Sequence, residues 1–380
     1  MNIQSKLPDV GTNIFSVMSA LANEHEAINL SQGFPDFDCP TELQDRVNFH
    51  LRNEKNQYVP MAGVPLLRER LALKMENAYG QPINPDTEIT ITAGATQALF
   101  TAITAFVHPG NEVILIEPAY DSYRPAIELA GGVPVIHELH GPDYQMDWER
   151  FGKLISSKTK MIIINTPHNP IGKVRSAEDM RALEVLTNGT DILVLSDEVY
   201  EHLIYDGKEH QSVLRFPELF KRSLLVYSFG KAFHSTGWKM GYCVAPELLM
   251  REFRKVHQFN VFSCNSFVQY GIADYLENPD TYQQLPAFYQ QKRDFFQQKL
   301  IGSALKPLAS EGSYFQLYDY SAVSDLGDKE FAKYLTTEIG VAVIPVSAFY
   351  SSGRDEKVVR FCFAKKEETL AAAGRLLRRL

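Results

Sequence analysis

The sequence predicts an α/β protein: a large domain with a mostly parallel sheet flanked by helices, and a smaller α+β domain. First, short apolar runs alternate with helical patterns between residues 88 and 228. Second, the pattern after Glu247 is helix-rich and then mixed. Third, 380 residues exceed one average domain of roughly 150 residues. Because parallel strands need crossover connections, which helices supply, the alternation favours a parallel sheet covered on both faces.

Two helices are expected before this sheet. Thr41 opens the first, with Gln44 three residues further on in a capping-box arrangement. Pro65 starts the second helix, and Gly80 ends it.

Six apolar runs are expected to form the strands of the large sheet. They are residues 88–92, 112–117, 133–137, 160–165, 192–197 and 223–228. Helical patterns lie between most of them, near 95–106, 122–130, 147–156 and 177–187. One further strand is expected in the C-terminal part, at 357–363.

Composition and charge narrow the class of partner. The chain is 45% hydrophobic and 22% charged, which suits a large core and argues against disorder. It carries 38 Lys and Arg against 46 Asp and Glu, a net charge of −8, and no basic run. A nucleic acid or an anionic membrane is therefore disfavoured as its main partner.

The cysteines indicate a reducing compartment. All are far apart and none forms a CxxC pair: Cys39, Cys243, Cys264 and Cys362. A zinc ribbon or a disulfide framework is therefore excluded, and no metal site is expected. The first 20 residues lack the apolar stretch of a secretory signal. We expect a cytoplasmic protein without a membrane span.

Polar residues follow five of the predicted strands, at the carboxyl ends where such sheets bind ligands. They are Gly94, Ala95, Thr96, Tyr120, Asn165, Asn169, Asp197, Tyr200, Ser228 and Lys231. The common nucleotide and hydrolase motifs GxGxxG, GxxxxGK[ST], HExxH and GxSxG are absent. This cluster is therefore the main functional signal in the sequence.

One end of the cluster suits a phosphate and a carbonyl group. Residues 94–96 offer free backbone N–H groups at a helix N-terminus, where an anion is favoured. Ser228 and Lys239 could add a hydroxyl group and a positive charge. Lys231, beside this phosphate site, can form a Schiff base with a carbonyl.

The other side chains suit an aromatic nitrogen ring. Asp197 can hold a protonated pyridine nitrogen, while Asn169 and Tyr200 can bond a phenolate oxygen. Tyr120 can stack on the ring. Phosphate, aldehyde, pyridine nitrogen and phenolate on one ring describe pyridoxal 5′-phosphate.

The motifs NTPHNPIG, DEVY and SFGKAFHSTGWKMG, in that order, resemble the class I/II aminotransferases of pyridoxal-phosphate fold type I. The resemblance runs through almost the whole chain, with NLSQGFPDF, QYVPMAGVPLLRERLA, TAGATQALF, EPAYDSY and VRFCFA. It is closest to the methionine-preferring branch, near the kynurenine–glutamine transaminases. It implies a large cofactor-binding domain at 41–275 and a small domain formed by 1–40 and 276–380.

The resemblance assigns roles around the cofactor ring. Lys231 is expected to form the Schiff base and later to move the substrate proton. Asp197 is expected to pair with the ring nitrogen, and Asn169 and Tyr200 to bond the ring oxygen. Tyr120 is expected to stack on the ring and belongs with Lys231 and Asp197 in the predicted catalytic set.

The phosphate group is expected to lie against Gly94, Ala95, Thr96, Ser228 and Lys239. Many members of the family have Arg where this chain has Lys239, and a lysine gives up the bidentate fork. Tyr58 matches a tyrosine that reaches the phosphate of the partner subunit, so a homodimer with shared active sites is implied.

At the substrate end, the resemblance implies that Arg360 grips the α-carboxylate in a bidentate fork and that the Gly33 N–H lies over it. Asn169 and Phe15 complete the predicted substrate site. The positions matching the family's side-chain pocket are Phe15, Tyr58, Tyr120, Phe262, Ser263 and Phe349. This lining is apolar and aromatic, and HQFNVFSCNS holds no arginine for a second carboxylate.

The expected function is transamination of an apolar, sulfur-containing or aromatic L-amino acid, with methionine favoured, to a 2-oxo acid. Phenylalanine, tyrosine, leucine, glutamine and kynurenine stay open as donors, and aspartate and glutamate are disfavoured. The main alternative is a cysteine-conjugate β-lyase, which would use the same cofactor and the same Lys231. A regulator with an aminotransferase-like domain and a nucleotide-dependent dehydrogenase are less well supported, because the basic DNA-binding module and the glycine fingerprint that they need are missing.

Overall fold

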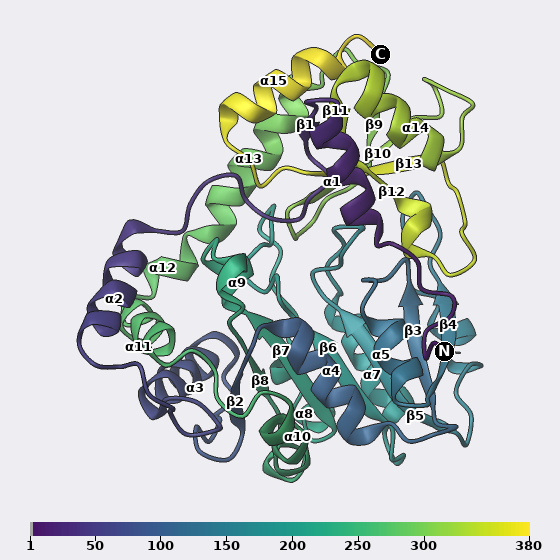
Figure 1. Ribbon diagram of the computed structural model, residues 1–380. Coiled ribbons are helices and arrows are strands. Elements are labelled where there is room, and N and C mark those ends of the chain that lie inside the picture. The colour runs from purple at the N-terminus through teal and green to yellow at the C-terminus, as the bar shows by residue number, and fades with distance from the viewer. Residues whose placement is uncertain (1–2) are drawn as a thin grey trace.

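The computed structural model describes residues 3–380, and a seven-stranded sheet lies at its centre (Figure 1). Its strands, in spatial order, are β2 (Ile89–Thr92), β8 (Gly241–Val244), β7 (Ser223–Ser228), β6 (Leu193–Asp197), β5 (Thr159–Asn165), β3 (Glu112–Glu117) and β4 (Val133–Glu138). From β7 to β4 every neighbouring pair is parallel, and β8 runs antiparallel to both β7 and β2. The predicted α/β class with a mostly parallel sheet is therefore confirmed.

The six strands expected in this sheet are all present, with bounds within one residue of the predicted ones. Strand β8 was not predicted. It has only four residues, and it directly follows the polar segment that carries Lys239. Because β8 is the one strand of opposite direction, β2, β3, β5, β6 and β7 end at the same edge of the sheet, as expected.

Helices cover both faces of the sheet. One face holds α4 (Ala95–Phe106), α5 (Tyr123–Leu129) and α10 (Glu247–Asn260), and the other holds α3 (Pro65–Tyr79), α6 (Trp148–Gly152), α7 (Ala177–Thr187) and α8 (Pro217–Phe220). Successive side chains of a strand enter opposite layers: Val194 of β6 joins one core and Leu195 the other. Burial on both faces explains why the strands read as continuous apolar runs.

Three predicted helix ends can be compared with the structure. The capping box at Thr41 is wrong: Thr41 is the first residue of α2 (Thr41–Arg52), Pro40 precedes it, and no side chain caps this end. The Gln44 amide donates instead to the Cys39 carbonyl, at 2.8 Å. Helix α3 begins at Pro65 and ends before Gly80, whose φ of 74° lies in the left-handed region, as predicted. Helix α6 is shorter than the expected 147–156.

The C-terminal part forms a second sheet of four antiparallel strands. Their order is β12 (Ile344–Pro345), β13 (Val358–Cys362), β10 (Phe315–Asp319) and β9 (Lys306–Pro307). The helices that accompany this sheet are α13 (Leu285–Lys299), α14 (Asp328–Tyr334) and α15 (Glu367–Leu377). Helix α11 (Ser266–Tyr275) packs instead against α2 and α3, and α12 (Asp280–Gln283) lies between α11 and α13 in the chain. Strand β13 confirms the strand expected at 357–363.

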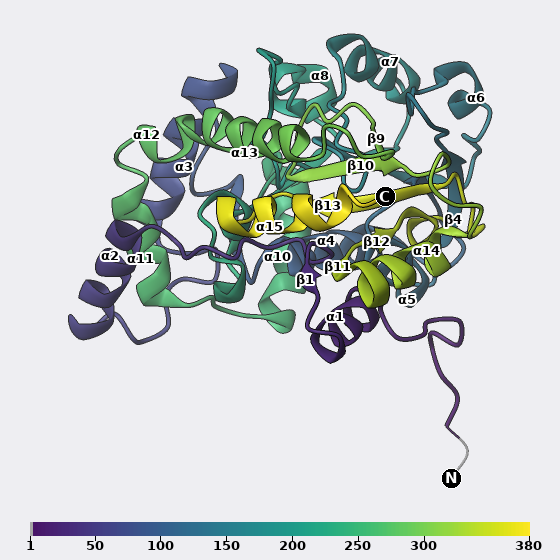
Figure 2. The same cartoon turned by 90° about the horizontal axis from the view of Figure 1, so that it is seen from above.

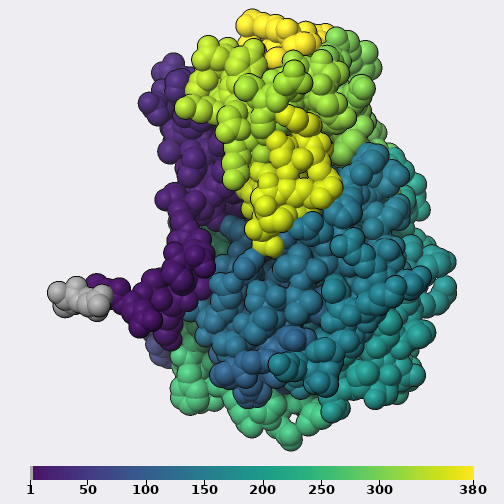
Figure 3. Space-filling model, turned by 90° about the vertical axis from the view of Figure 1, so that its right-hand side faces the viewer, coloured from purple at the N-terminus to yellow at the C-terminus, as the bar shows by residue number. Residues whose placement is uncertain are grey.

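The N-terminal segment joins this C-terminal part. After α1 (Ile14–Glu24), strand β1 (Ile28–Asn29) pairs in parallel with β11 (Val341–Ala342), and the three elements lie together in Figure 2. Figure 3 shows the purple segment running along the edge of the molecule from the green and yellow C-terminal part to the blue central part. The division into 41–275 and 1–40 with 276–380 stays a prediction. Within residues 3–380, no helix combines the length and the apolar character needed to cross a bilayer.

Candidate active site

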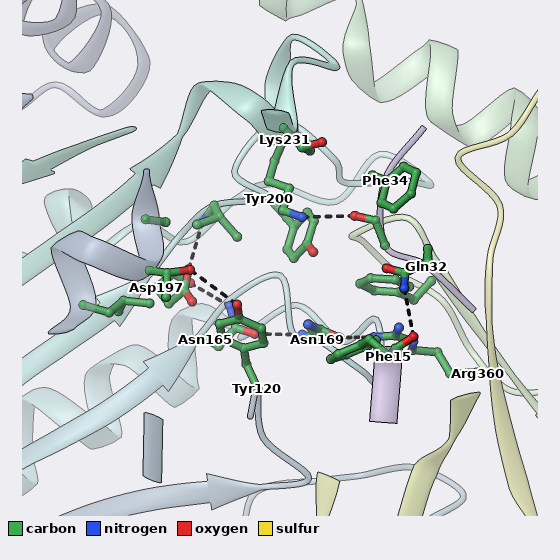
Figure 4. Close-up of a pocket in the computed structure, with 17 residues that line it drawn as sticks. Phe15, Gln32, Phe34, Tyr120, Asn165, Asn169, Asp197, Tyr200, Lys231 and Arg360 are labelled. Carbon is green, nitrogen blue, oxygen red and sulfur yellow. Dashed lines mark hydrogen bonds between the residues drawn. The ribbon is translucent and has the colours of Figure 1, made fainter. Parts of the chain in front are cut away.

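A cavity of about 260 Å³ opens at the carboxyl ends of the central strands. It brings together ten of the predicted site residues: Phe15, Gly33, Ala95, Thr96, Tyr120, Asn169, Asp197, Tyr200, Lys231 and Arg360. Figure 4 shows Asp197 and Arg360 at opposite ends of the pocket and Lys231 entering between them. Side chains from the N-terminal segment, the central sheet and strand β13 thus meet in one site.

The other four predicted residues do not line this cavity. Gly94 is the N-cap of α4. The Lys239 side chain lies beside it: a Cβ added to Gly94 would be 3.6 Å from Lys239 Cε. Ser228 ends β7, directly before the helical turn α9 (Phe229–Ala232) that carries Lys231. Tyr58 is 82% exposed, and its ring packs edge-to-face with that of Phe262, with ring centroids 5.3 Å apart. Its predicted role concerns a partner subunit and stays a prediction.

The start of α4 forms an anion-binding corner. Among residues 3–380, no protein acceptor bonds the N–H groups of Ala95 and Thr96, which belong to the first turn of this 12-residue helix. The partial positive charge of a helix N-terminus favours an anion there. Gly241 of β8 packs against this corner; a Cβ on it would lie 3.0 Å from the Ala95 nitrogen and 2.6 Å from the Tyr227 carbonyl oxygen. Only glycine allows this close approach.

Asp197 is a buried carboxyl group at the end of β6. Its Oδ2 accepts a hydrogen bond of 2.6 Å from the Tyr123 hydroxyl, and its Oδ1 one of 3.3 Å from the Val199 N–H. Burial raises the pKa of Asp197 to about 6, although these bonds and the charge of Lys231 oppose the rise. Within the described chain no cation lies within 4.0 Å of it. A buried acid without a cation fits a protonated ring nitrogen.

Lys231 follows β7 directly and points into the cavity. Its Nζ donates to the Gly33 carbonyl oxygen at 3.1 Å and to the Tyr314 hydroxyl at 2.9 Å. Burial lowers the pKa of Lys231 to about 8, and the charges of Arg360 and Lys239 act in the same direction. An amine that loses its proton near neutral pH suits a nucleophile and a proton carrier.

Arg360 of β13 is fully buried, yet no carboxylate pairs with it in the described chain. It donates to Asn169 Oδ1 at 2.7 Å and to the Ser31 carbonyl at 3.0 Å, while its Nε–H has no protein partner. Three phenyl rings surround the guanidinium group, those of Phe15, Phe315 and Phe349. Burial lowers its pKa to about 10, so it stays charged at neutral pH. This lone buried cation fits an anionic substrate group.

Two asparagines connect these groups. Asn165 donates from its amide to the Asp197 carbonyl at 2.9 Å and accepts from the Asn169 N–H at 2.7 Å. Asn165 therefore supports its neighbours. Because Asn169 Oδ1 accepts from Arg360, the amide NH₂ of Asn169 remains the donor that it can offer to a ligand.

Several residues of the site were missed from the sequence, among them Gln32, Tyr123 and Tyr314. Gln32 lines the cavity and donates to the Phe15 carbonyl at 3.0 Å, which ties α1 to the pocket. Tyr123 lies three residues after Tyr120, a helical spacing that could have placed both on one side. Tyr314 carries no local signal, because its contact with Lys231 spans 83 residues.

Known proteins resemble this chain over nearly its full length. The family model for aminotransferase class I and II matches residues 25–376. Methionine aminotransferase of Escherichia coli is 52% identical over 378 residues, covering 99% of this chain and 98% of that protein. Human kynurenine–oxoglutarate transaminase 1 is 36% identical, covering 98% and 97% of the two chains.

Solved structures agree with this result. The crystal structure of YbdL from E. coli, reported to identify a methionine aminotransferase function, matches with a TM-score of 0.98 and 51% identity over all of both chains. N-succinyldiaminopimelate aminotransferase of Mycobacterium tuberculosis matches with a TM-score of 0.95 and 33% identity, again over all of both chains. The chain therefore belongs to the class I and II aminotransferase family, and it is a pyridoxal-phosphate-dependent aminotransferase with the predicted fold type I architecture.

Proposed function

We propose that this enzyme moves the amino group of an apolar, sulfur-containing or aromatic L-amino acid, methionine above all, to a 2-oxo acid. One observation carries the proposal: a buried acid, a buried lysine and an unpaired buried arginine line one cavity. Its other walls include five aromatic rings, those of Phe15, Phe34, Tyr120, Tyr200 and Phe315. The 52% identity to the E. coli methionine aminotransferase supports methionine as donor.

The residues present fit pyridoxal phosphate. The free N–H groups of Ala95 and Thr96, with Ser228 and Lys239 nearby, would hold the phosphate. Asp197, which lacks a cation, would pair with the ring nitrogen.

Asn169, through its amide, and Tyr200 would bond the ring oxygen, and Tyr120 would stack on the ring. When bound, the cofactor supplies an aldehyde that condenses with amines and a protonated ring that withdraws electrons from the substrate Cα.

Lys231 acts as nucleophile and then as proton carrier. Its neutral amine would hold the cofactor covalently, and the amino group of the substrate would set it free. The freed Nζ then takes the proton from the substrate Cα and later returns it as an ammonium group. The lowered pKa of about 8 suits both steps, since neither the base nor the acid form is scarce near neutral pH.

Arg360 orients the substrate. The α-carboxylate would take the Nε–H that the chain leaves unbonded, and the Gly33 backbone N–H would support it. Holding the carboxylate fixes the direction of the Cα–H bond relative to Lys231. Phe15 and Tyr120 leave an apolar space for the side chain, and among the described lining residues Arg360 is the sole arginine. A second carboxylate, as in aspartate, would therefore be buried without a partner.

A homodimer with shared sites is part of the proposal. The support is a pair of packed, exposed rings: Tyr58 is 82% exposed and Phe262, which it contacts, is 46% exposed. Such rings rarely stay in water unless another surface covers them. The proposal also includes a cytoplasmic location and a division into a large domain at 41–275 and a small domain formed by 1–40 and 276–380.

Rates of transamination with methionine, phenylalanine and aspartate, each with a 2-oxo acid as acceptor, test the substrate class. We expect methionine to give the highest kcat/KM and aspartate a value at least a hundredfold lower, since an unpaired buried charge costs several kcal/mol. Aspartate as the best donor would overturn the proposal. Pyruvate formed from a cysteine conjugate without any acceptor would point to the β-lyase instead.

A further inference from the structure

Tyr314 holds the reactive nitrogen of Lys231 from the C-terminal part of the chain. The Lys231 Nζ donates to the Tyr314 hydroxyl at 2.9 Å and to the Gly33 carbonyl at 3.1 Å. The Tyr314 hydroxyl itself donates to the same Gly33 carbonyl. The three groups therefore form a closed triangle of hydrogen bonds beside the cavity.

Counting protons fixes the direction of each bond. A phenol has a single proton, and Tyr314 gives it to the Gly33 carbonyl, which can only accept. Toward Lys231 the phenol oxygen must therefore accept, and the nitrogen must donate. Burial raises the pKa of Tyr314 well above its ordinary value, so the hydroxyl keeps its proton at working pH.

The triangle is held rigidly. Tyr314 has no exposed surface, and its ring packs edge-on against Tyr200 and Phe315, with centroids 5.1 and 5.0 Å away. Gly33 has no room for a side chain, since a Cβ there would lie 2.9 Å from Phe315 Cζ. The neighbouring Ser31 carbonyl accepts from Arg360, so one short segment contacts both the lysine and the arginine.

We propose that Tyr314 is a positioning residue that holds the free amine of Lys231 for proton transfer. Besides its bond to Cε, Nζ has three directions open to partners. Two of them hold N–H groups that donate to Tyr314 and Gly33. The third holds a lone pair in the neutral amine and an N–H in the ammonium group. When the substrate Cα–H bond breaks, this lone pair forms the new N–H bond, and the C–H electron pair stays with the substrate. The role rests on the proposed transaminase function and adds a residue to it.

Tyr314→Phe tests the role, with Tyr205→Phe as the matched control. Tyr205 is equally buried, and its hydroxyl donates to the carbonyl of Ser313 in the same segment without touching Lys231. Either change removes one buried phenol hydroxyl and leaves the ring. The other ionisable groups that act on Lys231 stay unchanged in both variants: Asp197, Lys239, Arg360 and Cys362.

The first readout is the pKa of Lys231 in the cofactor-free protein, from the pH dependence of its acetylation by acetic anhydride, followed by peptide mass spectrometry. An acceptor on a buried ammonium group favours the charged form, so Tyr314→Phe should lower this pKa by about one unit. The second readout is the exchange of the methionine Cα hydrogen with D₂O in the loaded enzyme. We expect it to slow at least tenfold in Tyr314→Phe and less than twofold in Tyr205→Phe.

An unchanged pKa and an unchanged exchange rate in Tyr314→Phe would overturn the inference. If Tyr314→Phe fails to fold, 3-fluorotyrosine placed at position 314 keeps the ring and the hydroxyl and weakens the oxygen as an acceptor. It should lower the pKa of Lys231 in the same direction by a smaller amount, and no shift would again refute the role. Failure of the parent protein to transaminate would instead refute the proposed function, whatever the variants do.

Discussion

The buried carboxyl of Asp197 should reduce the stability of the cofactor-free protein above pH 6. Burial raises its pKa from 3.8 to about 6. Because the folded chain then holds the proton to higher pH than the unfolded chain, the free energy of unfolding falls as the pH rises through this window and stays low above it. A shift of about 2 units corresponds to about 3 kcal/mol.

Asp197→Asn keeps the shape of the side chain and removes the titrating group. At pH 5 the parent has already lost about half of the 3 kcal/mol, and by pH 8 it has lost all of it. The free energy of unfolding of Asp197→Asn, compared with that of the parent, should therefore rise by about 1.5 kcal/mol between pH 5 and pH 8. Urea unfolding of both cofactor-free proteins at the two pH values measures this difference. The same gain at both values would refute the reasoning, because it would show that Asp197 does not titrate between them.

Tyr123→Phe provides a second test of the same group. It removes the 2.6 Å hydrogen bond that favours the ionised form of Asp197. The pKa of Asp197 should therefore rise by about one unit further, and the pH window of stability loss should move upward with it. If the free energy of unfolding of Tyr123→Phe fell over the same pH range as that of the parent, this hydrogen bond would not stabilise the ionised carboxylate.

Three other predictions follow from single contacts. Arg360→Lys should lower kcat/KM for methionine about tenfold to a hundredfold and leave cofactor binding unchanged, because a lysine cannot form the fork; steady-state rates and the cofactor absorbance check this. Lys74→Met should cost about 3–5 kcal/mol in urea unfolding, since it leaves Glu201, its buried partner at 2.5 Å, without a cation. Covalent capture of pyridoxal phosphate by Lys231 should quicken with pH up to a midpoint near 8, measured as a rate–pH profile; a flat profile would contradict the lowered pKa.

The sequence predicted those parts of the fold and the site in which a local residue pattern marks both an element and the functional side chain at its end. Five of the six predicted strands of the large sheet are largely buried runs, and each of these ends in a polar residue, as β6 does in Asp197. Since parallel strands end at one edge of a sheet, the strand pattern of the sequence alone predicts that the site residues cluster there. Helix α3 was placed correctly because Pro65 and Gly80 mark its ends.

The remaining features depend on contacts between distant parts of the chain. Tyr314 reaches Lys231 across 83 residues, and nothing in its immediate neighbours reveals that contact. Tyr123 reaches Asp197 across 74 residues, and its spacing from Tyr120 is the local signal that could have pointed to it. The capping box failed because a threonine in the first helical position cannot act as the N-cap, a place that Pro40 takes.

The central claim is that Lys231 carries the cofactor. Reducing the purified enzyme with borohydride in the presence of pyridoxal phosphate fixes the cofactor on its lysine, and peptide mass spectrometry then identifies the residue. We expect the modification on Lys231, its disappearance in Lys231→Ala, and its persistence in Lys239→Ala. Modification at Lys239 instead, or none in the parent protein, would contradict the account.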